Sequence, residues 1–154
     1  LAQPVGHPTL TALAATLLAR RRAYYDALER ANKSNNVTAW LGWFAGIVVE
    51  AQKRAEAQVE FLVEKARLLD RLRGQLNARQ ERALLRVLRE GPEGFQGGLS
   101  AGNYMTITGA SPATATRDLA ELVEKGALVR RGERRHARYD VAIAVARNQI
   151  ESPE

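Results

Sequence analysis

Apolar residues recur every three or four positions through most of the chain, which is the spacing of one face of a helix. The pattern predicts helices over about residues 9–31, 37–74, 78–89, 100–107 and 111–126. After residue 126 the spacing shortens to alternation, which is the period of a strand. This succession predicts a mostly α protein with a small amount of β structure near its carboxy-terminal end.

Two short strands are expected after the last helix. Residues 127–131 and 136–141 alternate apolar and polar side chains, and residues 132–135 join them. The side chains expected to face the helices are Val129, Tyr139 and Val141.

The helix over residues 111–126 has clear signals at both ends. Ser111 is a good N-cap, Pro112 suits the first turn because its missing N–H needs no partner there, and Gly126 can adopt the left-handed conformation that ends a helix. The apolar face consists of Ala115, Leu119, Leu122 and Val123. The opposite face consists of Ala113, Arg117, Ala120 and Glu124. One face therefore packs against the protein, and the other is available to a partner.

Residues 100–126 read as a helix capped by Ser100, a short turn at Gly109 and a second helix. This order, followed by two strands, predicts a winged helix-turn-helix, in which the second helix enters the major groove of DNA. The expected organisation is a helical segment over residues 1–76, the winged helix-turn-helix over residues 77–142 and a tail over residues 143–154.

The longest predicted helix covers residues 37–74 and has Asn36 as its expected cap. A helix of this length is usually bent or shared with a partner, because it exceeds the width of a small domain. We expect it to link the amino-terminal helical layer to the carboxy-terminal module, and it is a candidate homodimer interface. In the next helix the residues expected to point inward are Leu84, Leu85 and Leu88, and those expected outward are Arg79, Arg82, Arg86 and Arg89.

Composition narrows the class of protein. The chain is 45% hydrophobic and 26% charged, as in ordinary globular proteins, and it has no apolar run long enough to span a membrane. It has no cysteine and only two histidines, His7 and His136, which leaves little from which to build a metal site. We therefore expect a cytoplasmic protein that uses no metal or other cofactor and does not bind a membrane.

Positive charge is concentrated in residues 130–138, where five arginines and one glutamate give +4 of the total net charge of +6. Such a patch attracts a polyanion, and the expected partner is double-stranded DNA. The expected DNA-binding residues are Ser111, Ala113, Thr114, Thr116, Arg117, Arg130, Arg131, Arg134, Arg135 and Arg138. Arg79 or Arg82 is a further candidate for a phosphate contact. Glu121 and Glu124 disfavour deep insertion of the whole helix, so a winged helix retained for protein–protein packing is the alternative.

A pattern in residues 111–139 resembles the winged helix that ends many Fic-family proteins. Its members are Ser111, Thr114, Ala115, Arg117, Asp118, Leu119, Leu122, Gly126, Leu128, Gly132, Arg135 and Tyr139. Upstream residues similar to the helices that follow the Fic catalytic loop are Arg22, Tyr24, Tyr25, Leu28, Thr38, Trp40, Leu41 and Phe44, and residues 76–80 resemble the start of the family's carboxy-terminal domain. The resemblance implies a regulatory module, linked to transcription regulation, of a protein whose other part transfers AMP.

The chain departs from that family at the catalytic motif. Fic enzymes use an H-P-F-x-x-G-N-G-R loop, whereas His7-Pro8 is followed here by Thr9-Leu10. The glycine-rich loop of this chain, residues 91–98, lacks the flanking strand and lysine of a phosphate-binding loop. We therefore expect no catalytic residue in this chain. Two hypotheses stay open: a DNA-binding regulatory module, or a dimerisation or regulatory protein-interaction tail of an upstream AMP-transferase domain.

Overall fold

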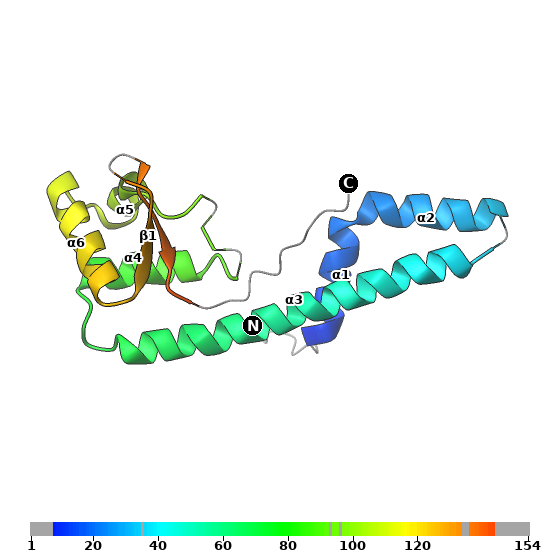
Figure 1. Ribbon diagram of the computed structural model, residues 1–154, viewed down its shortest axis with the longest axis horizontal. Coiled ribbons are helices and arrows are strands. Elements are labelled where there is room, and N and C mark those ends of the chain that lie inside the picture. Colours follow the sequence, from blue (N-terminus) through cyan, green and yellow to red (C-terminus); the bar gives the residue numbers. More distant parts are fainter. Residues whose placement is uncertain (1–7, 35, 93, 96, 134–135, 144–154) are drawn as a thin grey trace, which may run out of the picture. The chain divides into compact units, whose positions relative to one another are not determined.

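The computed structural model describes residues 8–34, 36–92, 94–95, 97–133 and 136–143. These residues form six helices and a two-stranded antiparallel sheet, so the expected mostly α class is confirmed (Figure 1). The helices are α1 (Pro8–Ala19), α2 (Arg21–Ser34), α3 (Thr38–Arg71), α4 (Ala78–Leu88), α5 (Ala101–Thr108) and α6 (Pro112–Glu124), and the strands are β1 (Leu128–Arg131) and β2 (Arg138–Val141). The chain divides into two compact units, Leu1–Val59 and Glu60–Glu154.

The first unit contains α1, α2 and the first part of α3. The predicted single helix over residues 9–31 is wrong, because the helix is interrupted at Arg20 and α2 continues to Ser34. The buried hydroxyl of Thr16 donates a hydrogen bond to the carbonyl of Ala12 (2.8 Å). A bond of this kind to the preceding turn favours a bend, and it lies just before the interruption.

Aromatic and small side chains join α2 to the beginning of α3. The ring centroids of Tyr24 and Trp43 are 6.0 Å apart, and Arg20 forms an ion pair with Glu50 (3.5 Å). Among residues 12–34 and 36–59, the buried apolar residues are Ala27, Ala31, Ile47 and Ala51. All but Ile47 are alanines, and the larger side chains Trp40, Trp43 and Phe44 are half-buried.

α3 is a single helix whose ends lie within three residues of the predicted ones. Asn36 caps it as expected, since its side-chain oxygen accepts a hydrogen bond from the amide of Thr38 (2.9 Å). The boundary between the compact units falls inside α3, whereas the predicted domain boundary followed residue 76. The reason is that Phe61 and Leu72 of α3 belong to the core of the second unit.

The second unit has one apolar core, formed by the last turns of α3, by α4 to α6 and by both strands. α4 is capped by Asn77, whose side chain accepts hydrogen bonds from the amides of Arg79 and Gln80 (both 3.0 Å). The buried face of α4 consists of Gln80, Ala83, Leu84, Val87 and Leu88. The expectation that Leu85 points inward is wrong: it is 36% exposed, because the spacing of that face places it on the flank of the helix.

α5 and α6 are joined by the predicted short turn. Ser100 caps α5, Gly109 ends it in the left-handed conformation (φ 71°), and Ser111 caps α6. The apolar face of α6 is fully buried at Ala115, Leu119 and Leu122. After α6 ends, Gly126 takes the predicted left-handed conformation (φ 64°).

Arg71, at the end of α3, is bound to the end of α6. Its guanidinium donates hydrogen bonds to the carbonyls of Lys125 (2.9 Å) and Gly126 (2.8 Å), which lie beyond the last intrahelical bonds of α6. A Cβ at Gly126 would lie 3.3 Å from Nη1 of Arg71. A side chain at this position therefore conflicts with the left-handed backbone and with the Arg71 contact.

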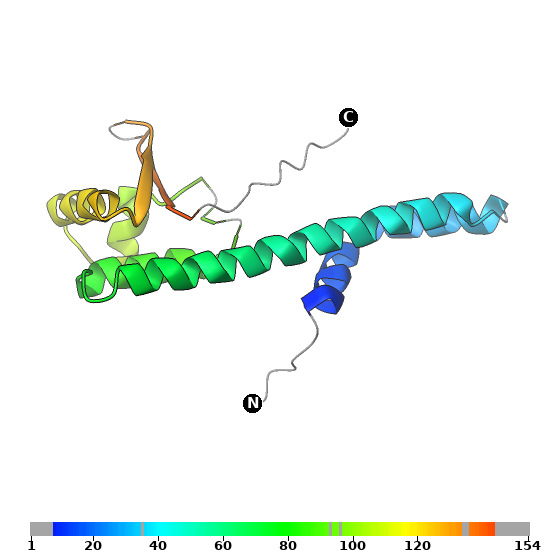
Figure 2. The same cartoon turned by 60° about the horizontal axis from the view of Figure 1, so that its bottom comes forward.

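The strands form a hairpin in which Leu128 is paired with Val141, and Arg131 with Arg138. Figure 2 shows this hairpin beside α6. The expected inward position of Val129 is wrong, because Val129 is 52% exposed whereas Leu128 is buried. Leu128 lies opposite Val141 on the face that also carries Tyr139, and that face packs on the core.

A further backbone pairing precedes α5. The amide of Leu99 donates to the carbonyl of Tyr139 (2.8 Å), and the amide of Tyr139 donates to the carbonyl of Leu99 (2.9 Å). This isolated bridge attaches the loop before α5 to β2 and so holds the start of α5 against the hairpin.

Gly126→Ala is expected to lower the free energy of unfolding by about 1–2 kcal/mol, because alanine is strained in the left-handed conformation and its Cβ crowds Arg71. Chemical denaturation followed by circular dichroism measures this change. Gly102→Ala is the matched control, since Gly102 lies inside α5 with room for a Cβ. Equal stability of Gly126→Ala and the wild-type chain would contradict the role assigned to this glycine.

Candidate nucleic-acid interface

The amino-terminal end of α6 is polar and open to solvent. The hydroxyl of Ser111 accepts a hydrogen bond from the amide of Thr114 (3.3 Å), and Thr116 donates its hydroxyl to the carbonyl of Pro112 (3.0 Å). On α6 and its cap, the predicted contact residues that are exposed are Ser111, Ala113, Thr116 and Arg117, and Thr114 is half-buried. The predicted α6 contacts therefore share one end of the helix.

Arg117 projects from the outer face of α6. Its side chain is 68% exposed, and its Nε lies 3.9 Å from Oε1 of Glu121, one turn further along the helix. An exposed ion pair at this distance is weak. The guanidinium is therefore available to a partner, including the acceptor edge of a guanine.

An open groove of about 430 Å³ lies beside α6. It is lined by Thr116 of α6, by Arg130 and Arg138 of the hairpin and by the first residues of α5. Arg130 is exposed and bonds to no other residue that the structure describes, and Arg138 donates only to the carbonyl of Ala137 (3.1 Å). The fold thus brings three of the predicted contact residues to one groove.

Of the remaining predicted arginines of the hairpin, Arg131 is paired within the protein. Arg131 does not line the groove and forms a two-point ion pair with Asp140, whose Oδ1 is 2.9 Å from Nη2. That contact raises the pKa of Arg131, and the carboxylate of Asp140 compensates its positive charge. Arg134 and Arg135 lie outside the described residues. In the described part of the hairpin, Arg130 and Arg138 are the arginines whose charge has no acidic partner.

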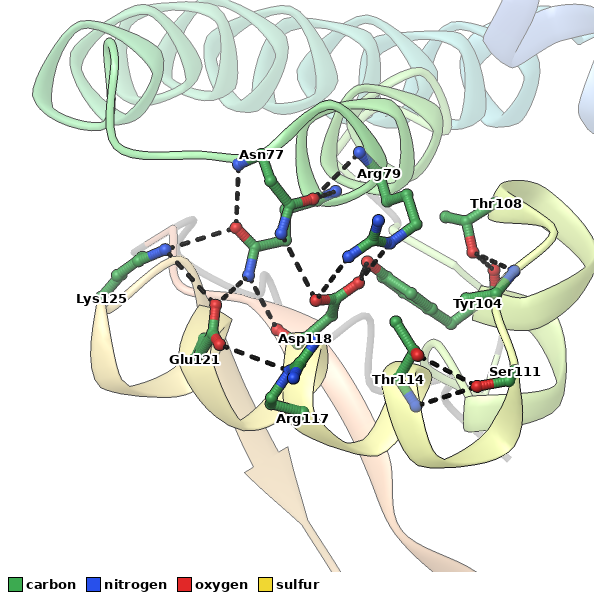
Figure 3. Close-up of polar contacts among 12 residues, drawn as sticks. Asn77, Arg79, Tyr104, Thr108, Ser111, Thr114, Arg117, Asp118, Glu121 and Lys125 are labelled. Carbon is green, nitrogen blue, oxygen red and sulfur yellow. Dashed lines mark hydrogen bonds and ion pairs between the residues drawn. The ribbon is translucent and has the colours of Figure 1, made fainter.

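Beneath the exposed face of α6 lies a buried carboxylate, Asp118, which is 1% exposed. Its Oδ2 accepts from Nε of Arg79 (2.8 Å) and from the hydroxyl of Tyr104 (3.0 Å), and its Oδ1 accepts from Nη2 of Arg79 and from the side-chain amide of Asn77 (both 3.3 Å) (Figure 3). This Asp118 cluster joins α4, α5 and α6 at one point.

The cluster keeps Asp118 ionised. The hydrogen bond from Arg79 is the largest influence and lowers the pKa of Asp118, while burial acts in the opposite direction. The same contact raises the pKa of Arg79, and burial together with Asp118 raises the pKa of Tyr104. Asp118 is therefore a charged and hydrogen-bonded group at neutral pH, as buried charges in proteins generally must be.

Glu121 is also held by contacts within the protein. Its Oε2 accepts a hydrogen bond from the side-chain amide of the buried Gln80 (2.8 Å) and lies 3.8 Å from Nζ of Lys125 (Figure 3). Its charge is thus partly compensated on the side of α6 that faces α4. Glu124 lies exposed near the carboxy-terminal end of α6, away from Ser111.

The sequence contained a signal for the Asp118 cluster that the prediction did not use. Asp118 lies three residues after Ala115 and four before Leu122, so it shares the buried face that these residues form with Leu119. A carboxylate within such a stripe must find a partner. Nothing in the local sequence identifies that partner, because Arg79 lies 39 residues earlier.

Within the described ranges, no group of three or more His, Cys, Asp or Glu side chains could hold a metal ion. No helix in that part of the chain is both long and apolar enough to cross a bilayer.

The chain matches no protein-family model and no curated protein. The resemblance of residues 111–139 to the Fic family therefore stays a prediction.

Asp118→Asn is expected to lower the free energy of unfolding at neutral pH by about 1–3 kcal/mol, because a neutral amide cannot satisfy the buried donors around it. A group whose pKa is lowered by folding stabilises the protein above its unfolded pKa, near 4, and that contribution is lost as the pH falls through the folded pKa. The stability difference between the variant and the wild-type chain should therefore shrink in acid.

Denaturation curves measured from about pH 7 to pH 2 check this expectation. Asp140→Asn serves as the control, because it removes a carboxylate from an ion pair on the surface of the hairpin, and it should change stability much less. A difference for Asp118→Asn that stays constant throughout the pH range would rule out an ionised Asp118 as its source.

Proposed function

We propose that the second unit is a winged helix-turn-helix that binds double-stranded DNA. The observation that carries the proposal is the groove beside α6, which brings Thr116 together with Arg130 and Arg138. The exposed end of α6 offers donors and small side chains to base edges, and the two arginines offer cations to phosphates.

The order of elements supports this proposal. A winged helix-turn-helix requires a fixed succession of elements, and this unit has that succession: α4, the bridge at Leu99, α5, a short turn, α6 and a hairpin. In this reading α6 lies in the major groove, which at about 12 Å is wide enough for one helix. The hairpin arginines then reach the backbone beside it.

The acidic residues of α6 limit how the helix binds. Glu121 is directed toward Gln80 and Lys125, so its charge is partly compensated inside the protein. Glu124 is exposed and would repel phosphates. The proposal therefore assigns base contacts to the end from Ser111 to Arg117 and keeps the other end of α6 away from the backbone.

The resemblance of residues 111–139 to Fic-family proteins adds a context to the proposal. In that context the chain is the carboxy-terminal part of a cytoplasmic Fic protein, and DNA binding links it to transcription regulation. The chain itself contributes no AMP-transfer chemistry in this proposal, because nothing in it corresponds to the family's catalytic loop.

Arg117→Ala and the double variant Arg130→Gln/Arg138→Gln are each expected to bind more weakly, by roughly 5- to 100-fold, to duplexes that the wild-type chain selects from a random pool. Fluorescence polarisation measures the affinities. Arg117→Ala should also relax base preference, whereas the double variant should mainly reduce the dependence on salt.

Arg73→Gln is the control for this experiment, since Arg73 is 82% exposed outside the groove and pairs with Asp70. The DNA-binding proposal is wrong if the wild-type chain enriches no duplex, or if neither variant differs from this control.

Protein interaction is the second candidate function, and large exposed apolar side chains on the first unit favour it. Leu41 is 54% exposed and Val48 is 41% exposed, seven residues apart on the same face of α3. Leu18 (72%) and Tyr25 (54%) are exposed on the neighbouring helices. Apolar groups left open in this way favour burial against another chain.

The simplest such contact is a homodimer interface on α3. The double variant Leu41→Gln/Val48→Gln is expected to shift the equilibrium from dimer toward monomer. Sedimentation over a range of concentrations measures the shift. Val129→Gln, at an equally exposed apolar residue of the hairpin, is the control. A wild-type chain that is monomeric at every concentration would exclude this contact.

A further inference from the structure

We infer that Arg79 and Arg82 of α4 contact a second DNA backbone strand, on the side of α6 opposite the groove. This α4 edge, defined by Arg79 and Arg82, would take the phosphates of one strand while Arg130 and Arg138 take those of the other. The inference rests on the proposed DNA-binding function and specifies how the duplex is held.

The geometry of α6 separates the two edges. Thr116 lines the groove, whereas Asp118 faces α4, and two positions along a helix correspond to roughly 160° around it. Arg117 stands between them and points outward. A helix lying in the major groove has one sugar-phosphate strand on each side, so both flanks of α6 are placed to meet phosphates.

Arg79 is held in a fixed orientation at this edge. Its Nε and Nη2 donate to Asp118, while its Nη1 bonds to no other residue in the described part of the chain, and the side chain is 40% exposed (Figure 3). The half of the guanidinium turned away from Asp118 is thus oriented beside α6, where Asp118 directly follows Arg117 in the sequence. An arginine already held by a carboxylate loses little freedom when its remaining donors bind a phosphate.

Arg82 supplies the net charge, because the buried Asp118 compensates that of Arg79. Arg82 is exposed, lies three residues after Arg79 on the same side of α4, and has no ion pair within the described residues. Glu81 projects about 100° around the helix from Arg82, and Glu90 is paired with Arg86. No acidic side chain of the described part of α4 therefore covers this edge, and Glu121 of α6, which faces α4, is held by Gln80 and Lys125.

The test compares Arg82→Gln with Arg89→Gln. Both variants remove one positive charge from an exposed arginine without an ion pair in the described ranges, but Arg89 lies about 10 Å further along, at the other end of α4. Fluorescence polarisation measures the affinity of the full chain for a mixed-sequence duplex of about 20 base pairs, which is two helical turns. The measurement is repeated at several NaCl concentrations between about 50 and 200 mM.

Arg82→Gln should make the slope of log affinity against log salt shallower by about 0.9, which corresponds to one lost phosphate contact, while Arg89→Gln leaves the slope unchanged. Equal slopes for the two variants would overturn the inference. If the wild-type chain does not bind the duplex and selects none from a random pool, the proposed function itself fails. Circular dichroism confirms folding, since neither arginine contacts the core.

Discussion

The arrangement of the second unit depends on the buried carboxylate of Asp118. A charge that is 1% exposed is stable only if donors surround it, and here the donors come from Asn77 and Arg79 of α4 and from Tyr104 of α5. The apolar core brings these helices together through the buried face of α6, which consists of Ala115, Leu119 and Leu122. Directional hydrogen bonds to one carboxylate add to this packing, so Asp118 and the apolar face together determine which face of α6 remains outside.

Both ends of α6 are held as well, and by different means. Ser111 satisfies an amide at the first turn, and Arg71 of α3 satisfies carbonyls beyond the last turn, next to the left-handed Gly126. Each of these contacts lies at an end or an inner side of the helix. Arg117 and Thr116 therefore make only local contacts within α6, which leaves their side chains available to a partner.

Local signals in the sequence predicted local structure well. The caps at Ser100 and Ser111 and the glycine at 126 act on neighbouring residues, so their roles can be read from their positions. The inward position of Leu128 depends on contacts with other elements, and the alternation in this strand allowed either face to be buried. For the candidate site, the exposed end of α6 was predicted, but its connection to Arg130 and Arg138 through one groove required the fold.

The residues that carry the Fic resemblance mostly have structural roles. Ala115, Asp118, Leu119, Leu122, Leu128 and Tyr139 are buried, and Ser111, Gly126 and Gly132 occupy a cap or left-handed turns. A pattern of this kind is maintained by packing, so it indicates the fold more directly than it indicates a ligand. Among its described members Arg117 is the exposed cation. The proposed DNA binding therefore depends on Arg117 and on two residues outside the pattern, Arg130 and Arg138. No described acidic side chain closely neutralises the charges of these three arginines.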